Sequence, residues 1–174
     1  MIPEFIIDLM TFPGVMVHGL ARRLVCDWTG TKVWEVCYFR IGTPSGFVIH
    51  DAPATVWGHL LIDASPLLFN SLIGGLIGLL AVPLKHVDGL LGNSVLVLVL
   101  WLAVSIAMHA FPEARAAQAI WAAIGRRDAP LSARLLGTPL VGLLYVGVWG
   151  SFFRFDFFYG VGVVFGLQYL LRLL

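Results

Sequence analysis

The sequence predicts an α-helical integral membrane protein with about five transmembrane helices and one β-hairpin, and the composition is the first evidence for it. Of its 174 residues, 59% are hydrophobic and 12% are charged, and the mean hydropathy is +0.91. Soluble domains average about 45–50% apolar and about 25% charged residues, so a soluble protein is excluded. A net charge of +1 argues against a nucleic-acid partner. We expect residues 1–174 to form a single membrane domain.

Apolar regions predict where the chain crosses the membrane, because a helix needs about 20 apolar residues to span a bilayer. We expect crossings at about residues 5–21, 60–82, 93–111, 135–152 and 157–172. The last two come from one apolar region that is too long for a single crossing and is interrupted at Phe153-Arg154-Phe155-Asp156. Two spans joined by a tight turn account for this region. One long bent helix is the alternative, with four crossings in all.

Small residues recur in two of these spans. The second span contains Gly74-Gly75-x-x-Gly78, and the last contains Gly160, Gly162 and Gly166. Small side chains let helices approach one another closely in a membrane. We therefore expect helix packing on these faces, either within the protein or against a partner subunit.

A different pattern predicts a β-hairpin at about residues 32–51, between the first and second spans. Residues 32–40 are rich in β-branched and aromatic side chains, and the turn-forming run Gly42-Thr43-Pro44-Ser45-Gly46 follows them. Phe47-Val48-Ile49-His50 is then the return strand. An open strand edge cannot face lipid, because its backbone groups would stay unpaired. The hairpin must therefore lie at the membrane interface or pack against protein.

Basic residues predict the orientation, since cytoplasmic loops carry an excess of Lys and Arg. Eight of them fall after the first span or in the polar segment at about residues 113–134, and they are Arg22, Arg23, Lys32, Arg40, Arg115, Arg126, Arg127 and Arg134. The other two turns hold only Lys85 and Arg154. Five crossings then place the N-terminus outside and the hairpin, the polar segment and the C-terminus in the cytoplasm, in agreement with Arg172. Four crossings would leave the C-terminus outside.

The end of the first span carries His18-Gly19-Leu20-Ala21-Arg22, which is close to the His-Glu-x-x-His motif of zinc proteases. In that motif two histidines one helical turn apart bind zinc, and the glutamate is the general base for the bound water. Here Gly19 has no group that can transfer a proton. Arg22 keeps its positive charge at any working pH and would repel Zn²⁺. Two of the three required groups are missing.

Three further tracts place this motif in a family context: residues 11–18, residues 35–51 and the block Trp101-Leu102-Ala103-Val104-Ser105-Ile106-Ala107-Met108-His109-Ala110-Phe111-Pro112. With these tracts the chain resembles a group of small membrane zincins related to the site-2 protease family of intramembrane zinc metalloproteases. The resemblance covers the first two-thirds of the chain by motif and the last third by hydropathy.

The resemblance implies a role for each matching position. His18 matches the first zinc ligand, Gly19 the catalytic glutamate and Arg22 the second ligand. His109 belongs to the second block, after which family members carry an acidic residue where this chain has Ala116. The hairpin resembles the site-2 protease hairpin that presents substrate strands to the site, and the residues we expect to contact such a strand are Tyr38, Arg40, Phe47 and His50.

These departures predict a proteolytically inactive relative, a pseudoprotease, without a cofactor. We expect it in a bacterial inner membrane, where it binds the lipid bilayer and other membrane subunits or a peptide strand, the strand by β-augmentation along the hairpin. One alternative is an active metalloprotease with a rearranged zinc site made by His18, His109 and Asp63. Another is a purely structural subunit of a membrane complex.

Overall fold

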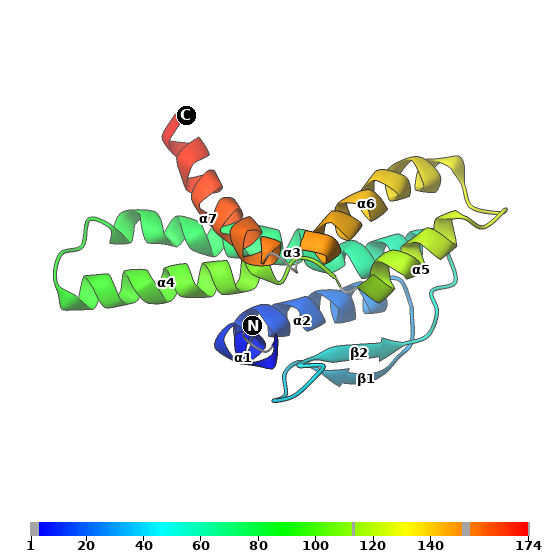
Figure 1. Ribbon diagram of the computed structural model, residues 1–174, viewed down its shortest axis with the longest axis horizontal. Coiled ribbons are helices and arrows are strands. Elements are labelled where there is room, and N and C mark those ends of the chain that lie inside the picture. Colours follow the sequence, from blue (N-terminus) through cyan, green and yellow to red (C-terminus); the bar gives the residue numbers. More distant parts are fainter. Residues whose placement is uncertain (1–3, 113, 151–153, 174) are drawn as a thin grey trace.

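The computed structural model of the chain describes residues 4–112, 114–150 and 154–173, and these residues are mostly helical (Figure 1). The elements in chain order are α1 (Glu4–Met10), α2 (Phe12–Trp28), β1 (Val33–Cys37), β2 (Phe47–His50), α3 (Val56–Leu84), α4 (Leu90–Met108), α5 (Ala114–Ile124), α6 (Leu131–Gly150) and α7 (Phe155–Leu173).

Three of the described helices are long and apolar enough to cross a membrane: α3, α4 and α6. They correspond to the spans expected at about residues 60–82, 93–111 and 135–152. The first expected span is divided between α1 and α2, with the break at Thr11, and the fifth corresponds to α7. The prediction of a helical membrane protein is thus supported at this coarser level, whereas five crossings stay a prediction.

Helices α3 and α4 form a close antiparallel pair, because a glycine lies at their contact. A Cβ atom on Gly74 would come within 2.8 Å of the carbonyl oxygen of Ala103 and of the backbone nitrogen of Ala107. Only glycine lets the two backbones lie this close. The expected packing role of the Gly74-Gly75-x-x-Gly78 run is therefore met inside the protein.

The other helices cover different parts of α3 (Figure 1). Helices α5 and α6 pack over its N-terminal half, where Leu60 and Leu67 share a buried cluster with Ile120 and Leu144. Helix α7 packs on α4 and on the C-terminal half of α3. Helix α2 contacts α3 and α4 on another side and also contacts the hairpin.

The predicted hairpin is present as an antiparallel pair of β1 and β2. Its register pairs Cys37 with Phe47 and Val36 with Val48, and an irregularity follows between Glu35 and Val33. Val48 is buried, whereas Ile49 on the other face is 49% exposed. The hairpin therefore presents one face to the protein, and its residues lie close to the middle of α2.

Candidate functional site

The position expected for the second zinc ligand is held by an ion pair. The Nη2 atom of Arg22 in α2 donates to Oδ1 of Asp63 in α3 at 2.9 Å. Nη2 also lies 3.3 Å from Nε2 of His50 at the end of β2. The Asp63 side chain is only 5% exposed and the Arg22 side chain 19%. One guanidinium thus joins three elements that are far apart in sequence.

The orientation of the His50 ring fits its role as an acceptor. Its Nδ1 donates to the backbone oxygen of Asp51 at 2.8 Å, so the hydrogen of the neutral ring is on Nδ1. Nε2 then offers a lone pair to Arg22. His50 therefore supports the guanidinium.

The first ligand position, His18, is held by a backbone contact. Its Nδ1 donates to the carbonyl oxygen of His109 at 2.9 Å, which leaves Nε2 with the free lone pair in the neutral ring. Metal-binding histidines commonly donate their second ring nitrogen in this way. The structure therefore brings His18 close to the His109 block, through the backbone of His109.

The His109 ring itself makes other contacts. Its Nδ1 lies 3.0 Å from the backbone oxygen of Ser105, and its Nε2 lies 3.5 Å from Oδ1 of Asp8. Both neighbours are hydrogen-bond acceptors. The other oxygen of Asp8 accepts a hydrogen bond from the Ser45 hydroxyl. This cluster ties α1 and the hairpin loop to the end of α4.

Asn70 of α3 is a second polar junction behind the site. Its Nδ2 atom donates to the backbone oxygens of Gly14 at 3.1 Å and Ile106 at 3.0 Å, and the side chain is fully buried. A Cβ atom on Gly14 would come within 2.0 Å of the Ser105 oxygen. Helices α2, α3 and α4 are therefore held together at one point.

Four more of the predicted residues, Gly19, Tyr38, Arg40 and Phe47, lie in or against the hairpin. A Cβ atom on Gly19 would lie 3.4 Å from Cδ1 of Tyr38, so the position expected for the catalytic glutamate faces the hairpin. Arg40 donates from Nε to the backbone oxygen of Pro44 at 2.9 Å, and its guanidinium lies 5.1 Å from the centre of the Phe47 ring. These two contacts of Arg40 stabilise the loop between β1 and β2.

Ala116 is not brought to these residues. It is buried in α5, and α5 packs against α3 and α6. The loop that carries Arg40 and the helix that carries Ala116 therefore belong to different parts of the structure.

In the part of the chain that the structure describes, two of the three side chains of the alternative metal site, His109 and Asp63, contact groups outside that set. His109 faces Ser105 and Asp8, and Asp63 faces Arg22. Across residues 4–112, 114–150 and 154–173, no three His, Cys, Asp or Glu side chains are close enough to share a metal ion. The contacts that the structure shows at these side chains are an ion pair and hydrogen bonds.

Sequence reasoning did not assign Asp8, Ser45 or Asn70 to the site. The available signal was the rule that polar or ionisable residues inside a span mark functional positions, which applies to Asp8 and Asn70. For Ser45 there was no comparable signal, because a serine in a turn is ordinary.

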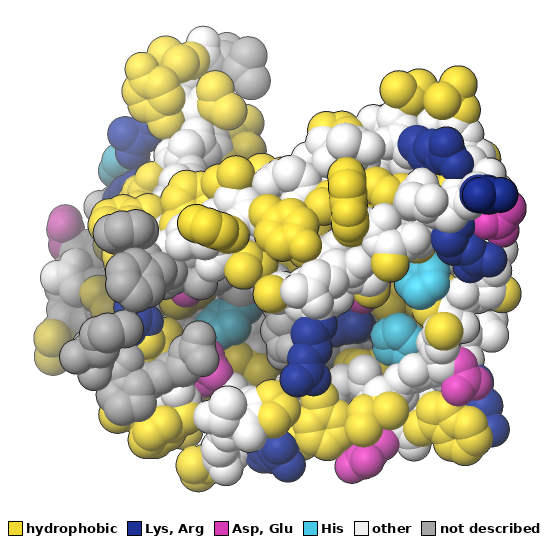
Figure 2. Space-filling model, turned by 45° about the vertical axis from the view of Figure 1, so that its right-hand side comes forward, with side chains coloured by type: hydrophobic (Ala, Val, Ile, Leu, Met, Phe, Trp, Pro, Cys, Tyr) yellow, Lys and Arg dark blue, Asp and Glu magenta, His cyan; other side chains and the backbone are white. Residues whose placement is uncertain are grey.

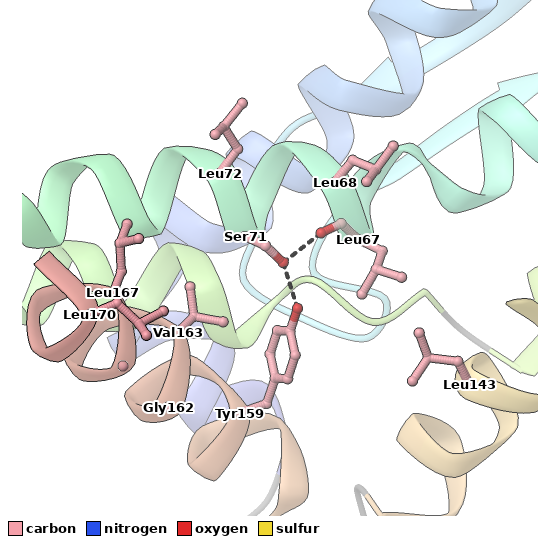
Figure 3. Close-up of a pocket in the computed structure, with 11 residues that line it drawn as sticks. Leu67, Leu68, Ser71, Leu72, Leu143, Tyr159, Gly162, Val163, Leu167 and Leu170 are labelled. Atoms are coloured by element: carbon pink, nitrogen blue, oxygen red, sulfur yellow. Dashed lines mark hydrogen bonds between the residues drawn. The ribbon is translucent and has the colours of Figure 1, made fainter. Parts of the chain in front are cut away.

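Figure 2 shows histidine side chains beside Lys and Arg side chains across the middle of one face, among hydrophobic side chains. A separate open groove of about 680 Å³ lies between α3, α6 and α7 (Figure 3). Its lining is apolar apart from the hydroxyls of Ser71 and Tyr159, and it contains none of the predicted site residues.

No family model matches this chain, and no curated protein or solved structure matches it either.

Proposed function

We propose that this protein is a proteolytically inactive relative of the site-2 protease family, a pseudoprotease that binds or scaffolds a membrane-protein or peptide partner as a subunit of a membrane complex. The observation that carries the proposal is the Arg22–Asp63 ion pair. The positive charge of Arg22 repels a second cation, and the Asp63 carboxylate is already engaged by Arg22.

The lack of a proton-transfer group is the second support. A Cβ atom on Gly19 would be in ordinary contact with the Tyr38 side chain, so this position faces the hairpin. Glycine has no side chain that could act as a general base there.

The binding role is supported by the hairpin. Among the described residues, the backbone hydrogen bonds of β1 and β2 stay within the hairpin and its flanking residues. Unpaired strand edges are the groups that β-augmentation uses. We infer that an extended peptide segment pairs with one of these edges.

Metal analysis of the purified protein tests the loss of zinc chemistry. We expect substoichiometric zinc that does not change in His18→Ala or His109→Ala variants. Stoichiometric zinc that is lost in both variants would refute the pseudoprotease and support the alternative enzyme. One observation favours that alternative: Nε2 of His18 is left free in the manner of a metal ligand.

Partner capture in mild detergent tests the binding role with a matched pair at one position. Ile49→Pro removes a backbone amide of β2, whereas Ile49→Ala keeps it and shortens an exposed side chain. We expect the proline variant to lose the partner and the alanine variant to retain it. Equal capture by both variants would indicate that the hairpin is not the binding edge, as a purely structural subunit requires.

A further inference from the structure

The pair α3–α4 gives the direction of the membrane normal. These two helices are the most apolar of the three that are long and apolar enough to cross a membrane. They run antiparallel and are joined by the short connection at residues 85–89. The N-terminal end of α3 therefore faces one side of the membrane, and the connection faces the other.

Helix α6 begins beside the N-terminal end of α3. A Cβ atom on Gly137 would lie 3.1 Å from Cδ2 of Leu60. Further along α6, Val141 and Leu144 belong to the same buried cluster as Leu60 and Leu67.

Helix α7 begins beside the middle of α3. The hydroxyls of Tyr159 and Ser71 are 2.7 Å apart, and Figure 3 shows this contact among the residues that line the groove. Near the start of α7, the Phe155 ring lies 5.7 Å from the ring of Phe111, just beyond the end of α4. These contacts pack the start of α7 against the middle of α3 and against the residue that follows α4 closely.

Helix α7 continues toward the C-terminal end of α3. A Cβ atom on Gly78 would come within 2.8 Å of the Val164 side chain. Gln168 donates from Nε2 to the backbone oxygen of Gly78 at 2.8 Å and accepts from Nζ of Lys85 at 2.7 Å. The end of α7 is thus tied to the end of α3 that carries the connection to α4.

The contacts of α6 and then α7 follow α3 from its N-terminal end toward its C-terminal end, from Leu60 through Ser71 to Gly78. From Leu60 to Gly78 the α3 axis rises about 27 Å at about 1.5 Å per residue, which is close to the thickness of one hydrocarbon core, about 30 Å. If α6 and α7 were two full antiparallel crossings, Gln168 would lie beside Leu60. It lies beside Gly78 instead.

We propose that α6 and α7 together make a single, discontinuous crossing, so that the C-terminal end of the chain lies on the membrane face of the α3–α4 connection, opposite α5. Arg172 then lies on the same side as Lys85, and the eight basic residues around α2, the hairpin and α5 lie on the other. Basic residues at the two membrane faces are then divided eight against two, which agrees with the excess expected on the cytoplasmic side. This topology corresponds to the alternative of four crossings that the sequence left open, and not to the expectation of five; it does not depend on the proposed function.

Accessibility of single cysteines tests this topology in the full chain. In a Cys26→Ser/Cys37→Ser background, Leu173→Cys is compared with Val87→Cys in the connection and Asp128→Cys after α5. All three positions are exposed, at 66%, 49% and 68%. A membrane-impermeant maleimide is applied to intact cells and to inverted membrane vesicles.

We expect Leu173→Cys and Val87→Cys to react from one side and Asp128→Cys from the other. Reaction of Leu173→Cys from the same side as Asp128→Cys would overturn the proposal. A second measurement keeps the natural cysteines: an epitope tag after the last residue and one inserted after Arg127 are probed in separate full-length chains. Tags on opposite sides support a single crossing, and tags on the same side refute it.

Discussion

The Arg22–Asp63 pair makes the sharpest prediction, because one of its members is almost completely buried. Arg22→Met leaves the Asp63 carboxylate, 5% exposed, without its cation. Breaking a buried pair costs about 3–5 kcal/mol. Because the Arg22 side chain is 19% exposed and water screens part of the interaction, we expect a loss of about 2–3 kcal/mol. The Arg22→Met/Asp63→Leu double variant removes both charges and should recover to within about 1 kcal/mol of the parent.

Thermal unfolding in mild detergent measures the effect. For a chain of this size about 1 kcal/mol corresponds to a change of about 2–4 °C in Tm, so the single variant should unfold about 4–12 °C lower. Arg23→Met is the matched control, since Arg23 pairs at 3.1 Å with Asp27 and both side chains are substantially exposed. It should change stability by less than about 0.5 kcal/mol.

The double variant decides whether the reasoning holds. If it is as unstable as Arg22→Met, the loss comes from the arginine stem and its packing, and not from an unpaired carboxylate. If Arg22→Met is as stable as the parent, the ion pair does not neutralise Asp63 at all.

Three more predictions concern the packing around the site. Asn70→Ala removes two buried hydrogen bonds and should lower stability by about 1–3 kcal/mol in the same unfolding assay; an unchanged Tm would show that the junction is not structural. Gly74→Ala forces a methyl group against the backbone of α4 and should lower the free energy of unfolding by about 1–3 kcal/mol. Gly162→Ala is the control, because the space around its Cβ is open, and it should be neutral or stabilising by up to about 1 kcal/mol. Equal effects of the two substitutions on Tm would contradict the close contact of α3 and α4. Cys26 is fully buried and Cys37 only partly, so a maleimide should modify Cys37 first in the folded protein and both after denaturation, as followed by mass spectrometry; earlier modification of Cys26 would contradict the packing of α2.

Local pattern predicted the elements well where one physical property dominated. Composition and long apolar runs indicated a membrane protein, and β-branched residues around a Gly-Pro turn indicated the hairpin, whose strands Val33–Cys37 and Phe47–His50 lie within the expected range. The glycines of α3 were also informative, because a small side chain at a helix contact has the same meaning wherever the partner helix lies.

The site was predictable only as a set of positions. The sequence indicates that Gly19 and Arg22 stand where a zinc protease needs a base and a ligand. It does not tell which carboxylate pairs with Arg22. Asp63 is 41 positions away, and Asp8, Asp27 and Asp51 are all closer to Arg22 in the sequence. The approach of α2 to α3 makes that choice.

By itself, the sequence predicted helices apolar enough to cross a membrane and a hairpin after the first of them, and it placed Gly19 and Arg22 at the positions where a His-Glu-x-x-His motif has its base and its second ligand. These properties depend on residue type and spacing along one segment. Only the tertiary structure decided that Arg22 contacts Asp63 and His50, and that the His109 ring lies beside Asp8. It also decided that α6 packs near the N-terminal end of α3 and α7 near its C-terminal end. Such contacts depend on which segments meet in space, and neither hydropathy nor spacing within a segment specifies that meeting.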